Sequence, residues 1–393
     1  PSVIDMLASR VTSDFEPKIK EERIHVEDIQ DSVEDVLIQA DYADVAKSYI
    51  LYRKQREKIR NMRSTILDYK DLVDSYVKAT DWRVKENSTV TYSVGGLILN
   101  NSGAITANYW LSEIYDDEIA NAHKNGDLHI HDLSMLTGYC AGWSLKQLIQ
   151  EGLGGVVGKI TSKPASHLAT LCNQMVNFLG IMQNEWAGAQ AFSSFDTYLA
   201  PFVKVDNLDY DQVKKCVESF IYGVNTPSRW GTQAPFSNVT LDWTVPNDLA
   251  EMNCIIGGKE VDFKYKDCKK EMDMINKAFI EVMLEGDANG RGFQYPIPTY
   301  SITSDFDWSD TENNRLLFEM TAKYGTPYFS NYVNSDMEPS DVRSMCCRLR
   351  LDLRELRRKS GGFFGSGEST GSVGVVTINL PRIAYLAKSK EEF

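Results

Sequence analysis

The strongest constraint on the fold is the alternation of strand-like and helix-like segments in the second half of the chain. Strand-like segments are expected at residues 237–241, 295–302 and 326–329, with helices between them at 265–285 and 311–323. A helix between two strands returns the chain to the same edge of the sheet, so such strands can pair in parallel. The pattern predicts an α/β domain with parallel strands in a barrel-like arrangement.

The composition agrees with a globular protein and argues against other classes. Of the 393 residues, 42% are hydrophobic and 25% are charged, which is enough for a large core or for two domains. No apolar run reaches the roughly 18–20 residues that cross a bilayer, and no secretory signal stands at the start. The net charge of −13 argues against a general nucleic-acid binder. We therefore expect no nucleic-acid and no membrane partner. The net charge does not exclude a local basic pocket that binds nucleotides.

The cysteines favour a reducing compartment. There are seven of them, an odd number, and they are scattered along the chain, unlike those of a secreted disulfide scaffold. No Cys-x-x-Cys or His-x-x-x-His spacing occurs, so we expect no metal site in this chain. These observations predict a cytoplasmic protein.

Two cysteine positions are candidates for thiol chemistry. Cys346 and Cys347 precede a glycine-rich loop at residues 361–371, which leads into residues 373–382, where we expect a buried strand. Cys140 stands just before a helix-like segment. A single cysteine is more commonly buried structural filler, and sequence distance does not show whether Cys140 and Cys347 meet. Both interpretations stay open at this point.

The first 60 residues predict a separate helical unit. Apolar residues recur at helical spacing in residues 26–37, and a second helix is expected over residues 42–60. Composition alone favours a simple helical hairpin. The amino-acid sequence of the segment, however, resembles the C-terminal half of an ATP-cone, the regulatory nucleotide-binding domain of ribonucleotide reductases. The resemblance implies a partial cone over residues 1–60, without a complete ATP site, and a catalytic domain over residues 61–393.

From about residue 85 to the end, the sequence resembles the catalytic subunit of anaerobic (class III) ribonucleoside-triphosphate reductases, which are glycyl radical enzymes. The matching stretches are residues 125–133, 225–243, 345–348 and 374–382. Several long matches in order are far more specific than one motif. The resemblance implies a ten-stranded α/β barrel of the glycyl radical enzyme/ribonucleotide reductase type, with a small, mainly helical N-terminal regulatory domain.

The resemblance also implies catalytic roles for two cysteines. Cys347 corresponds to the cysteine that carries the transient thiyl radical, and Cys346 is its neighbour at a variable position. Cys140 corresponds to the second cysteine, which reduces the substrate from the opposite face. These roles suit the chemistry, because removing the 3′-hydrogen of a ribose needs a strong hydrogen acceptor in a closed site. Losing the 2′-hydroxyl needs a proton donor and a one-electron source, which a second thiol can supply.

A ribonucleoside triphosphate is the substrate that the resemblance implies. Its phosphates need backbone N–H groups or a helix N-terminus. The candidate substrate-binding residues are Ser228, Ser237, Asn238, Ser372 and Asn379. For the turn that contains Ser228, ordinary turn and capping roles are equally open.

Residues 143–200 are expected to be mostly helical, and those up to 192 resemble the family's dimer interface, where a dNTP effector sets substrate choice. The polar candidates for effector binding are Lys159, Lys163 and Gln174. A solvated lysine is the simpler interpretation of either lysine. His129 and His131 are expected to cap or orient a loop.

Formate is the expected reductant. Ser372 stands where formate-using relatives carry an asparagine, and Glu368 is the loop candidate for the glutamate of thioredoxin-type relatives, so thioredoxin stays the alternative. The resemblance further implies a homodimer, higher oligomers with dATP, control by ATP/dATP and dNTPs, and a radical-SAM activating enzyme. The radical glycine and the zinc-binding cysteines of the family do not occur in these 393 residues. We expect both in a segment beyond Phe393.

Two other functions stay open. One is another glycyl radical enzyme, similar to pyruvate formate-lyase, since those enzymes also carry adjacent cysteines. The other is a catalytically inactive nucleotide-sensing assembly module, which a missing radical glycine would permit. The cone-like segment and residues 225–243 favour the reductase.

Overall fold

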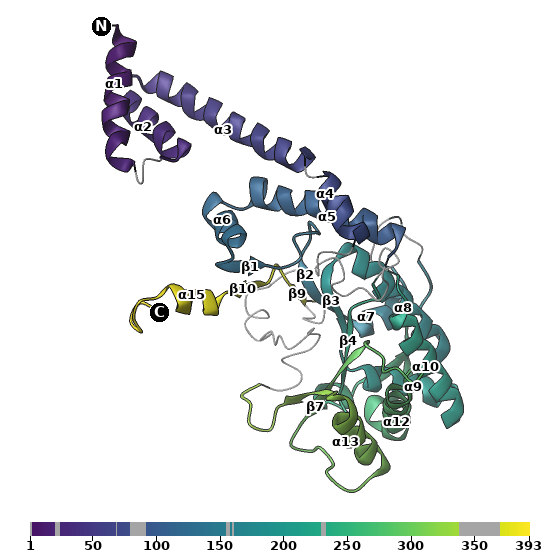
Figure 1. The fold of residues 1–393 in the computed structure, drawn as a ribbon. Coiled ribbons are helices and arrows are strands. Elements are labelled where there is room, and N and C mark those ends of the chain that lie inside the picture. Colours follow the sequence, from purple (N-terminus) through teal and green to yellow (C-terminus); the bar gives the residue numbers. More distant parts are fainter. Residues whose placement is uncertain are drawn as a thin grey trace. The chain divides into compact units, whose positions relative to one another are not determined.

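The chain folds into two compact units, Pro1–Asp74 and Ser75–Phe393. The structure is a computed structural model that describes residues 2–19, 24–67, 69–78, 92–154, 158, 161–228, 233–337 and 370–393. The described part of the first unit is helical, whereas the second unit combines helices with strands (Figure 1). None of the described helices has the length and apolar character needed to cross a membrane.

Ion pairs hold two helices of the first unit together. Its elements are α1 (Val3–Phe15), the 3₁₀ turn η1 (Glu16–Lys18), α2 (Val26–Gln39), α3 (Ala43–Leu67) and α4 (Tyr69–Lys78), which continues into the second unit. The Arg53 guanidinium on α3 lies 2.5–2.8 Å from the carboxylates of Glu27, Asp31 and Glu34 on α2. Such charge-assisted bonds fix α2 against α3. The two helices predicted in residues 26–60 are confirmed.

The second unit contains helices of widely different length. In chain order they are α5 (Val94–Tyr109), the π-helix η3 (Trp110–Ile114), α6 (Asp117–Asn125), α7 (Leu145–Glu151), α8 (Leu168–Glu185), α9 (Phe195–Val205), α10 (Tyr210–Asn225), α11 (Asn247–Ala250), the 3₁₀ turn η4 (Tyr265–Cys268), α12 (Lys269–Glu285), α13 (Glu312–Tyr324) and α15 (Leu380–Leu386). The helices predicted near 265–285 and 311–323 are confirmed as η4 with α12 and as α13.

The strands of the second unit form a mainly parallel sheet. They are β1 (Leu128–Ile130), β2 (Tyr139–Trp143), β3 (Ala187–Phe192), β4 (Ser237–Leu241), β5 (Asn253–Ile256), β6 (Lys259–Lys264), β7 (Ile297–Ile302), β8 (Tyr328–Asn331), β9 (Thr370–Ser372) and β10 (Val376–Ile378). Six of them pair in the order β8-β7-β4-β3-β2-β9, in which only β9 is antiparallel to its neighbour. The predicted α/β fold with parallel strands is confirmed, and the ten-stranded barrel stays a prediction.

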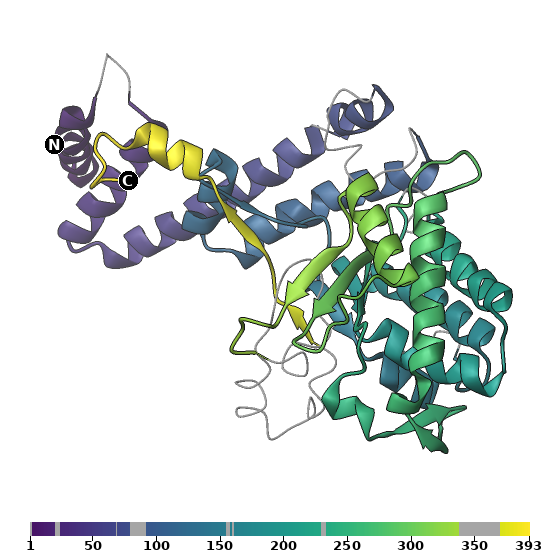
Figure 2. The ribbon, with the colours of Figure 1, turned by 90° about the horizontal axis from the view of Figure 1, so that it is seen from below.

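The two faces of this sheet differ in side-chain character. Successive residues of a strand point to opposite faces, and one face packs in a common core with helices α8, α9, α10 and α12 (Figures 1 and 2). That face carries Phe192, Val239, Leu241 and Tyr300. The opposite face, called the small-residue face below, carries Ala189, Ala191, Asn238, Thr240 and Thr299. Its residues are too small and too polar for an ordinary apolar core.

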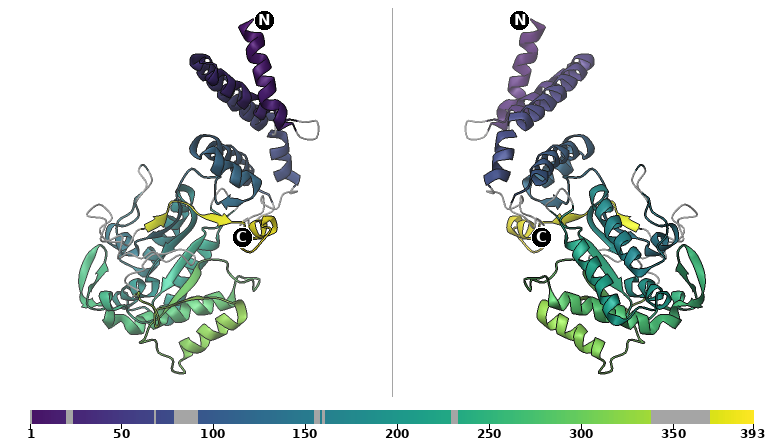
Figure 3. Two further views of the ribbon diagram at one scale, coloured as in Figure 1. Left: turned by 90° about the vertical axis from the view of Figure 1, so that its left-hand side faces the viewer. Right: turned by 90° about the vertical axis from the view of Figure 1, so that its right-hand side faces the viewer.

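One sequence prediction in this unit is wrong. Residues 373–382 were expected to form a buried strand, but only Val376–Ile378 is strand, all three of its residues are exposed, and helix α15 begins at Leu380. The reason is the pairing, because β10 meets β1 in a two-stranded antiparallel sheet apart from the main core. This segment is drawn in yellow in Figure 3. Apolar, β-branched residues therefore formed a strand here without burial.

A buried carboxylate joins the C-terminal ends of β3 and β4 to the helices. Ser194, in the left-handed region with φ of 54°, precedes α9 and places Asp196 in its first turn. The Asp196 carboxylate accepts hydrogen bonds from the N–H groups of Asp242 (2.8 Å) and Trp243 (2.9 Å), and from Nδ2 of Asn276 on α12 (2.9 Å). Burial raises the pKa of Asp196, and these donors oppose that shift. One side chain therefore ties together α9, α12 and the end of β4.

We predict that Asp196→Ala destabilises the second unit by at least about 3 kcal/mol, because it leaves several buried N–H donors without an acceptor. Chemical denaturation followed by circular dichroism measures the change. Asp310→Ala, which removes an exposed ion pair with Arg315, is the control and should change stability little. Equal effects of the two substitutions would contradict the anchoring role of Asp196.

Candidate functional site

Cys140 lies at an irregularity in the pairing of β2 with β3. The pairing steps from Tyr139–Ala187 to Ala141–Gln190, so two residues of β3 stand opposite the single residue Cys140. Cys140 has a φ of 55°, in the left-handed region that residues other than glycine rarely adopt. Backbone outliers of this kind concentrate at functional sites. The cysteine is 3% exposed and packs with the small-residue face.

The antiparallel strand β9 brings a second predicted site residue to the same place. Ser372 pairs with Tyr139 and Gly371 pairs with Ala141, and the register shifts again at Cys140. Cys140 and Ser372, which are far apart in the sequence, are therefore neighbours across two strands. The sequence predicted a site role for each residue, but only the sheet pairing shows that they meet.

Asn238 supplies a buried acceptor on the small-residue face. It pairs with Ala191 of β3, and its Nδ2 donates a hydrogen bond of 3.3 Å to Oγ1 of Thr299 on β7. The residue is 1% exposed, and within the described part of the chain its Oδ1 has no hydrogen-bond partner. A buried oxygen in this state is costly unless a water or a ligand donates to it. Because β3 separates β2 from β4, Asn238 and Cys140 lie on strands roughly 10 Å apart.

Two other predicted substrate residues lie elsewhere. Ser237 precedes Asn238 in β4 and therefore points to the opposite, helix-packed face, where its buried Oγ has no partner in the part of the chain that the structure describes. Ser228 accepts a hydrogen bond from Nε2 of Gln183 near the end of α8, and its N–H donates to the carbonyl of Gln233 at 3.0 Å. These contacts join the segment before β4 to α8. The substrate contacts of Ser237 and Ser228 stay predictions.

Asn379 acts as a structural cap in this fold. Its Oδ1 accepts the N–H of Arg382 at the start of α15 (3.1 Å), and its Nδ2 donates to the carbonyl of Gly126 (2.8 Å). The Arg382 guanidinium adds an ion pair of 2.7 Å with Asp127. Both ends of the Asn379 amide thus join α15 to the turn between α6 and β1. Its predicted contact with substrate stays a prediction.

Two of the effector candidates meet in space. Nε2 of Gln174 on α8 donates to Oγ of Ser162 (2.8 Å) and to the carbonyl of Lys163 (2.7 Å). Gln174 is buried, and no described residue donates a hydrogen bond to its Oε1. The amide of Gln174 therefore fixes the backbone of the loop that carries Lys163. The sequence alone did not show that these two residues are in contact.

A row of three histidines runs from α6 along β1, and the ring centroid of His131 lies 6.0 Å from that of Tyr139 on β2. The ring centroids of His123 and His129 are 5.3 Å apart, and those of His129 and His131 are 4.7 Å apart. Nδ1 of His123 accepts the N–H of Ile130 at 3.0 Å, and burial lowers the pKa of His123, helped by His129 and Lys124. Nε2 of His131 meets Oγ1 of Thr377 at 2.7 Å, across the β1–β10 pair. These contacts agree with the expected loop-orienting role of His131; the sequence had not singled out His123.

Several predicted site residues lie outside the described part of the chain. They are Lys159, Cys346, Cys347 and Glu368. In the part that the structure describes, no group of three or more His, Cys, Asp or Glu side chains is arranged to hold a metal ion. The site that can be built from the described residues therefore rests on Cys140, Ser372 and Asn238.

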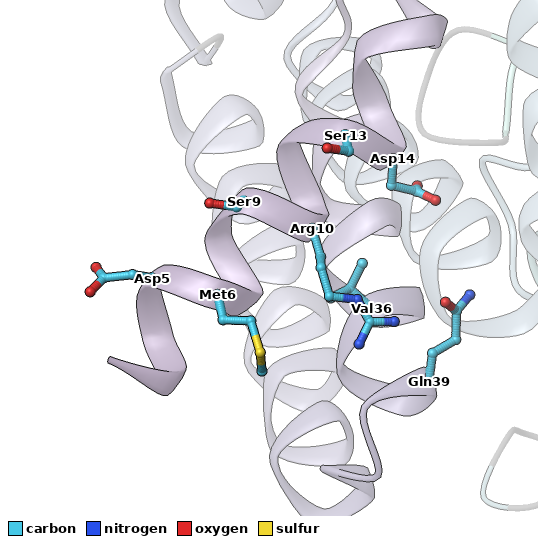
Figure 4. Close-up of a pocket in the computed structure, with 8 residues that line it drawn as sticks. All are labelled: Asp5, Met6, Ser9, Arg10, Ser13, Asp14, Val36 and Gln39. Atoms are coloured by element: carbon cyan, nitrogen blue, oxygen red, sulfur yellow. The ribbon is translucent and has the colours of Figure 1, made fainter. Parts of the chain in front are cut away.

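The first unit has a hollow of its own, between α1 and α2 (Figure 4). Its volume is about 620 Å³. The lining residues are Asp5, Met6, Ser9, Arg10, Ser13, Asp14, Val36 and Gln39. Arg10 is balanced by two carboxylates in this lining, whereas a triphosphate site needs several cations or N–H groups. The hollow by itself therefore offers few of the groups that a triphosphate needs, and the partial cone stays a prediction.

We predict that Asn379→Ala weakens α15 by about 1 kcal/mol, the usual cost of losing a helix cap. Hydrogen exchange of the α15 amides measures the loss of protection. Asn379→Asp retains a capping oxygen and should keep most of that protection. Unchanged exchange in Asn379→Ala, together with weaker nucleotide binding, would instead support a substrate contact.

Comparisons with known proteins agree with this fold. The family model for anaerobic ribonucleoside-triphosphate reductase matches residues 86–393, and the ATP cone domain model matches residues 1–58. The anaerobic ribonucleoside-triphosphate reductase of Haemophilus influenzae is 22% identical over 94% of this chain and 52% of its own length.

Solved structures of the anaerobic ribonucleotide reductase from Thermotoga maritima share the fold. The structure with citrate in the active site has a TM-score of 0.58 and 22% identity, over 86% of this chain and 64% of that one. The complex with dATP and CTP has a TM-score of 0.54 and 21% identity, over 84% of this chain and 56% of that one. The chain spans about half the length of the curated relatives it matches. Because the reductase model matches most of its residues, the chain belongs to the anaerobic ribonucleoside-triphosphate reductase family.

Proposed function

We propose that the protein reduces ribonucleoside triphosphates to 2′-deoxyribonucleoside triphosphates under anaerobic conditions, by thiyl radical chemistry. The observation that carries the proposal is the place of Cys140, in a strained conformation at the small-residue face of a parallel sheet. Family membership supplies the reaction class. Residues 1–60 form the partial cone in this proposal, and residues 61–393 form the catalytic domain.

The proposed reaction divides the work between two cysteines. Cys347 removes the 3′-hydrogen of the ribose as a thiyl radical, and Cys140 serves as the second thiol, which helps to reduce the carbon that loses its 2′-hydroxyl as water. With formate as the reductant, the overall reaction consumes one formate and one proton, and it releases carbon dioxide and water. The glycyl radical, expected outside these residues, supplies the oxidising equivalent for the thiyl radical. Zinc is likewise expected outside them.

Cys140 fits its proposed role in three respects. The sulfur is buried, so water has little access to a radical formed beside it. The strand geometry fixes the backbone on both sides of the cysteine. On the neighbouring strand, Ala189 and Ala191 place only methyl groups beside the cysteine, and we propose that the ribose lies against them.

Asn238 is the ribose-binding residue that we propose from the small-residue face. Its Oδ1, which meets no donor among the described residues, can accept a hydrogen bond from a ribose hydroxyl, which would satisfy a buried acceptor. Ser372, beside Cys140, is proposed to face the same ligand. The amide of Asn238 is held by Thr299, so it needs little reorganisation on binding.

Allosteric control by nucleotides forms part of the proposal. The Thermotoga maritima relative was solved in complex with dATP and CTP. We propose dNTP effectors at the loop that Gln174 fixes, where Lys163 offers a cation. A homodimer, higher oligomers with dATP, regulation by ATP and dATP, and a radical-SAM activating enzyme complete the proposal.

The function is tested by anaerobic reduction of CTP and ATP by the full-length protein with a radical-SAM activase. We expect deoxynucleotide with formate. Product with a thioredoxin system alone would keep the reductase and move attention to Glu368 as the residue for that reductant. A glycyl radical signal without product from either reductant would favour a lyase related to pyruvate formate-lyase. Tight ATP or dATP binding that changes oligomer size, without radical or turnover, would favour an inactive sensing module.

Two cysteine substitutions separate the steps. Cys347→Ala should abolish nucleotide reduction while the glycyl radical signal survives, because the glycine lies elsewhere. Cys140→Ala should still release tritium from 3′-labelled substrate but should form no deoxynucleotide. Electron paramagnetic resonance, tritium release and product analysis measure the three quantities. Normal product formation by either variant would refute its assigned role.

We predict that Asn238→Ala raises KM for the nucleotide about tenfold, the effect of one lost hydrogen bond of roughly 1.4 kcal/mol. Steady-state kinetics over a range of substrate concentrations measures the change. Asn247→Ala, at an exposed position of α11, is the control and should leave KM unaltered. An unchanged KM for Asn238→Ala would remove Asn238 from the ribose site.

A further inference from the structure

Glycines flank Cys140 on both neighbouring strands. A Cβ atom added at Gly188 of β3 would lie 2.7 Å from the Cys140 sulfur, a distance that real Cβ atoms essentially never show, and 3.0 Å from its backbone nitrogen, which is also tight. A Cβ atom at Gly371 of β9 would lie 2.9 Å from the Cys140 carbonyl oxygen. Gly188 also has a φ of 68°, which favours glycine. The space around the sulfur therefore exists because residue 188 lacks a side chain.

The residue after this glycine contacts the sulfur directly. The N–H of Ala189 donates a hydrogen bond to Sγ of Cys140, with an N–S distance of 3.2 Å in a fully buried setting. In a regular parallel pair this N–H would bond a carbonyl of β2, but the register shift interrupts the ladder here. A buried N–H needs an acceptor. The sulfur of Cys140 therefore takes the place of a backbone carbonyl.

We propose that Gly188 and the N–H of Ala189 are the positioning elements for the Cys140 sulfur, which they hold on the small-residue face toward the substrate. This inference rests on the proposed function, in which Cys140 is the second thiol. The left-handed backbone of Cys140 displaces its side chain from the regular strand position. Gly188 has no side chain, so the sulfur can occupy the space beside it. The N–H of Ala189 then fixes the sulfur in one orientation through its hydrogen bond. Together the three features restrict the sulfur to one place along β3.

The arrangement differs from ordinary packing around a buried cysteine. A purely structural cysteine lies in a regular element among core side chains, as the buried Cys172 of helix α8 does in the main core. At Cys140 two unfavourable features, a left-handed non-glycine residue and a broken ladder, coincide with a glycine and an N–H aimed at the sulfur. Such strain persists only where the surroundings fix the geometry.

The test compares Gly188→Ala with Gly325→Ala in the full-length protein. Gly325 has a φ of 66°, and a Cβ atom there would meet nothing within 4 Å. Both substitutions carry the cost of alanine in a left-handed conformation, but only the first one displaces the Cys140 sulfur. Gly188→Ala should lower deoxynucleotide formation roughly 100-fold, as expected for a reacting group misplaced by about 1 Å. Release of 3′-tritium should continue, because that step belongs to Cys347. Gly325→Ala should keep both activities.

A double-mutant cycle tests the contact without relying on the reaction. Thermal unfolding midpoints of Gly188→Ala, Cys140→Ala and the double variant should show that removing the sulfur relieves part of the loss caused by Gly188→Ala. Equal midpoints and equal product formation for Gly188→Ala and Gly325→Ala would overturn the proposal. So would additive effects of the two substitutions, since the sulfur would then not be the group displaced.

The two proposals can fail separately. If the unsubstituted protein makes no deoxynucleotide, the proposed function fails, and the positioning role fails with it, even where the cycle shows the Gly188–Cys140 contact. If the unsubstituted protein is active and Gly188→Ala loses 3′-tritium release and product in parallel, the effect is general, and the specific positioning of Cys140 is refuted.

Discussion

The alternation of side chains across five parallel strands is the constraint on which the second unit depends. Side chains along a strand alternate between the two faces of the sheet, so every second residue faces the helices and the others face the opposite side. Phe192, Val239, Leu241 and Tyr300 supply the helix-packed face, and burial of such side chains contributes about 1.5–3 kcal/mol each. With stability supplied from that face, the opposite one can carry alanine, asparagine and threonine. Those residues would make a weak core, and they include the site residue Asn238.

The position of Cys140 follows from how neighbouring strands meet it. A left-handed residue other than glycine costs about 1–3 kcal/mol and persists only when its neighbours fix it. Here β3 and β9 pair with β2 on both sides, and the register changes at the cysteine on each side. At the other end of the sheet, Asp196 fixes the end of β4 through backbone donors. The C-terminal end of β4 is thus anchored, while Cys140 and Asn238 lie near the N-terminal ends of β2 and β4.

Prediction from the sequence succeeded where local pattern and tertiary role agree. The strands β4, β7 and β8 carry apolar residues between turn signals, and each was expected within a few residues of its observed place. The strand β3 was missed, because Ala187–Phe192 consists mostly of small residues and lies in a stretch expected to be helical. Its strand character comes from pairing with β2 and β4 on both sides. Residues 376–378 show the opposite error, since β-branched residues predicted burial that the two-stranded pairing does not provide.

The sequence by itself determined the class of the fold, the helical N-terminal unit, the family resemblance and the identity of the candidate cysteine Cys140, because these depend on local periodicity and on ordered motifs. Tertiary structure alone decided which candidates share a site. It placed Ser372 next to Cys140, separated Asn238 from Ser237 onto opposite faces, and gave Asn379 the role of a helix cap. It also assigned Gly188 and the N–H of Ala189 to the cysteine sulfur. The physical reason is that strand register is a long-range property: a shift of one residue changes the face of every side chain, and no local segment of sequence specifies it.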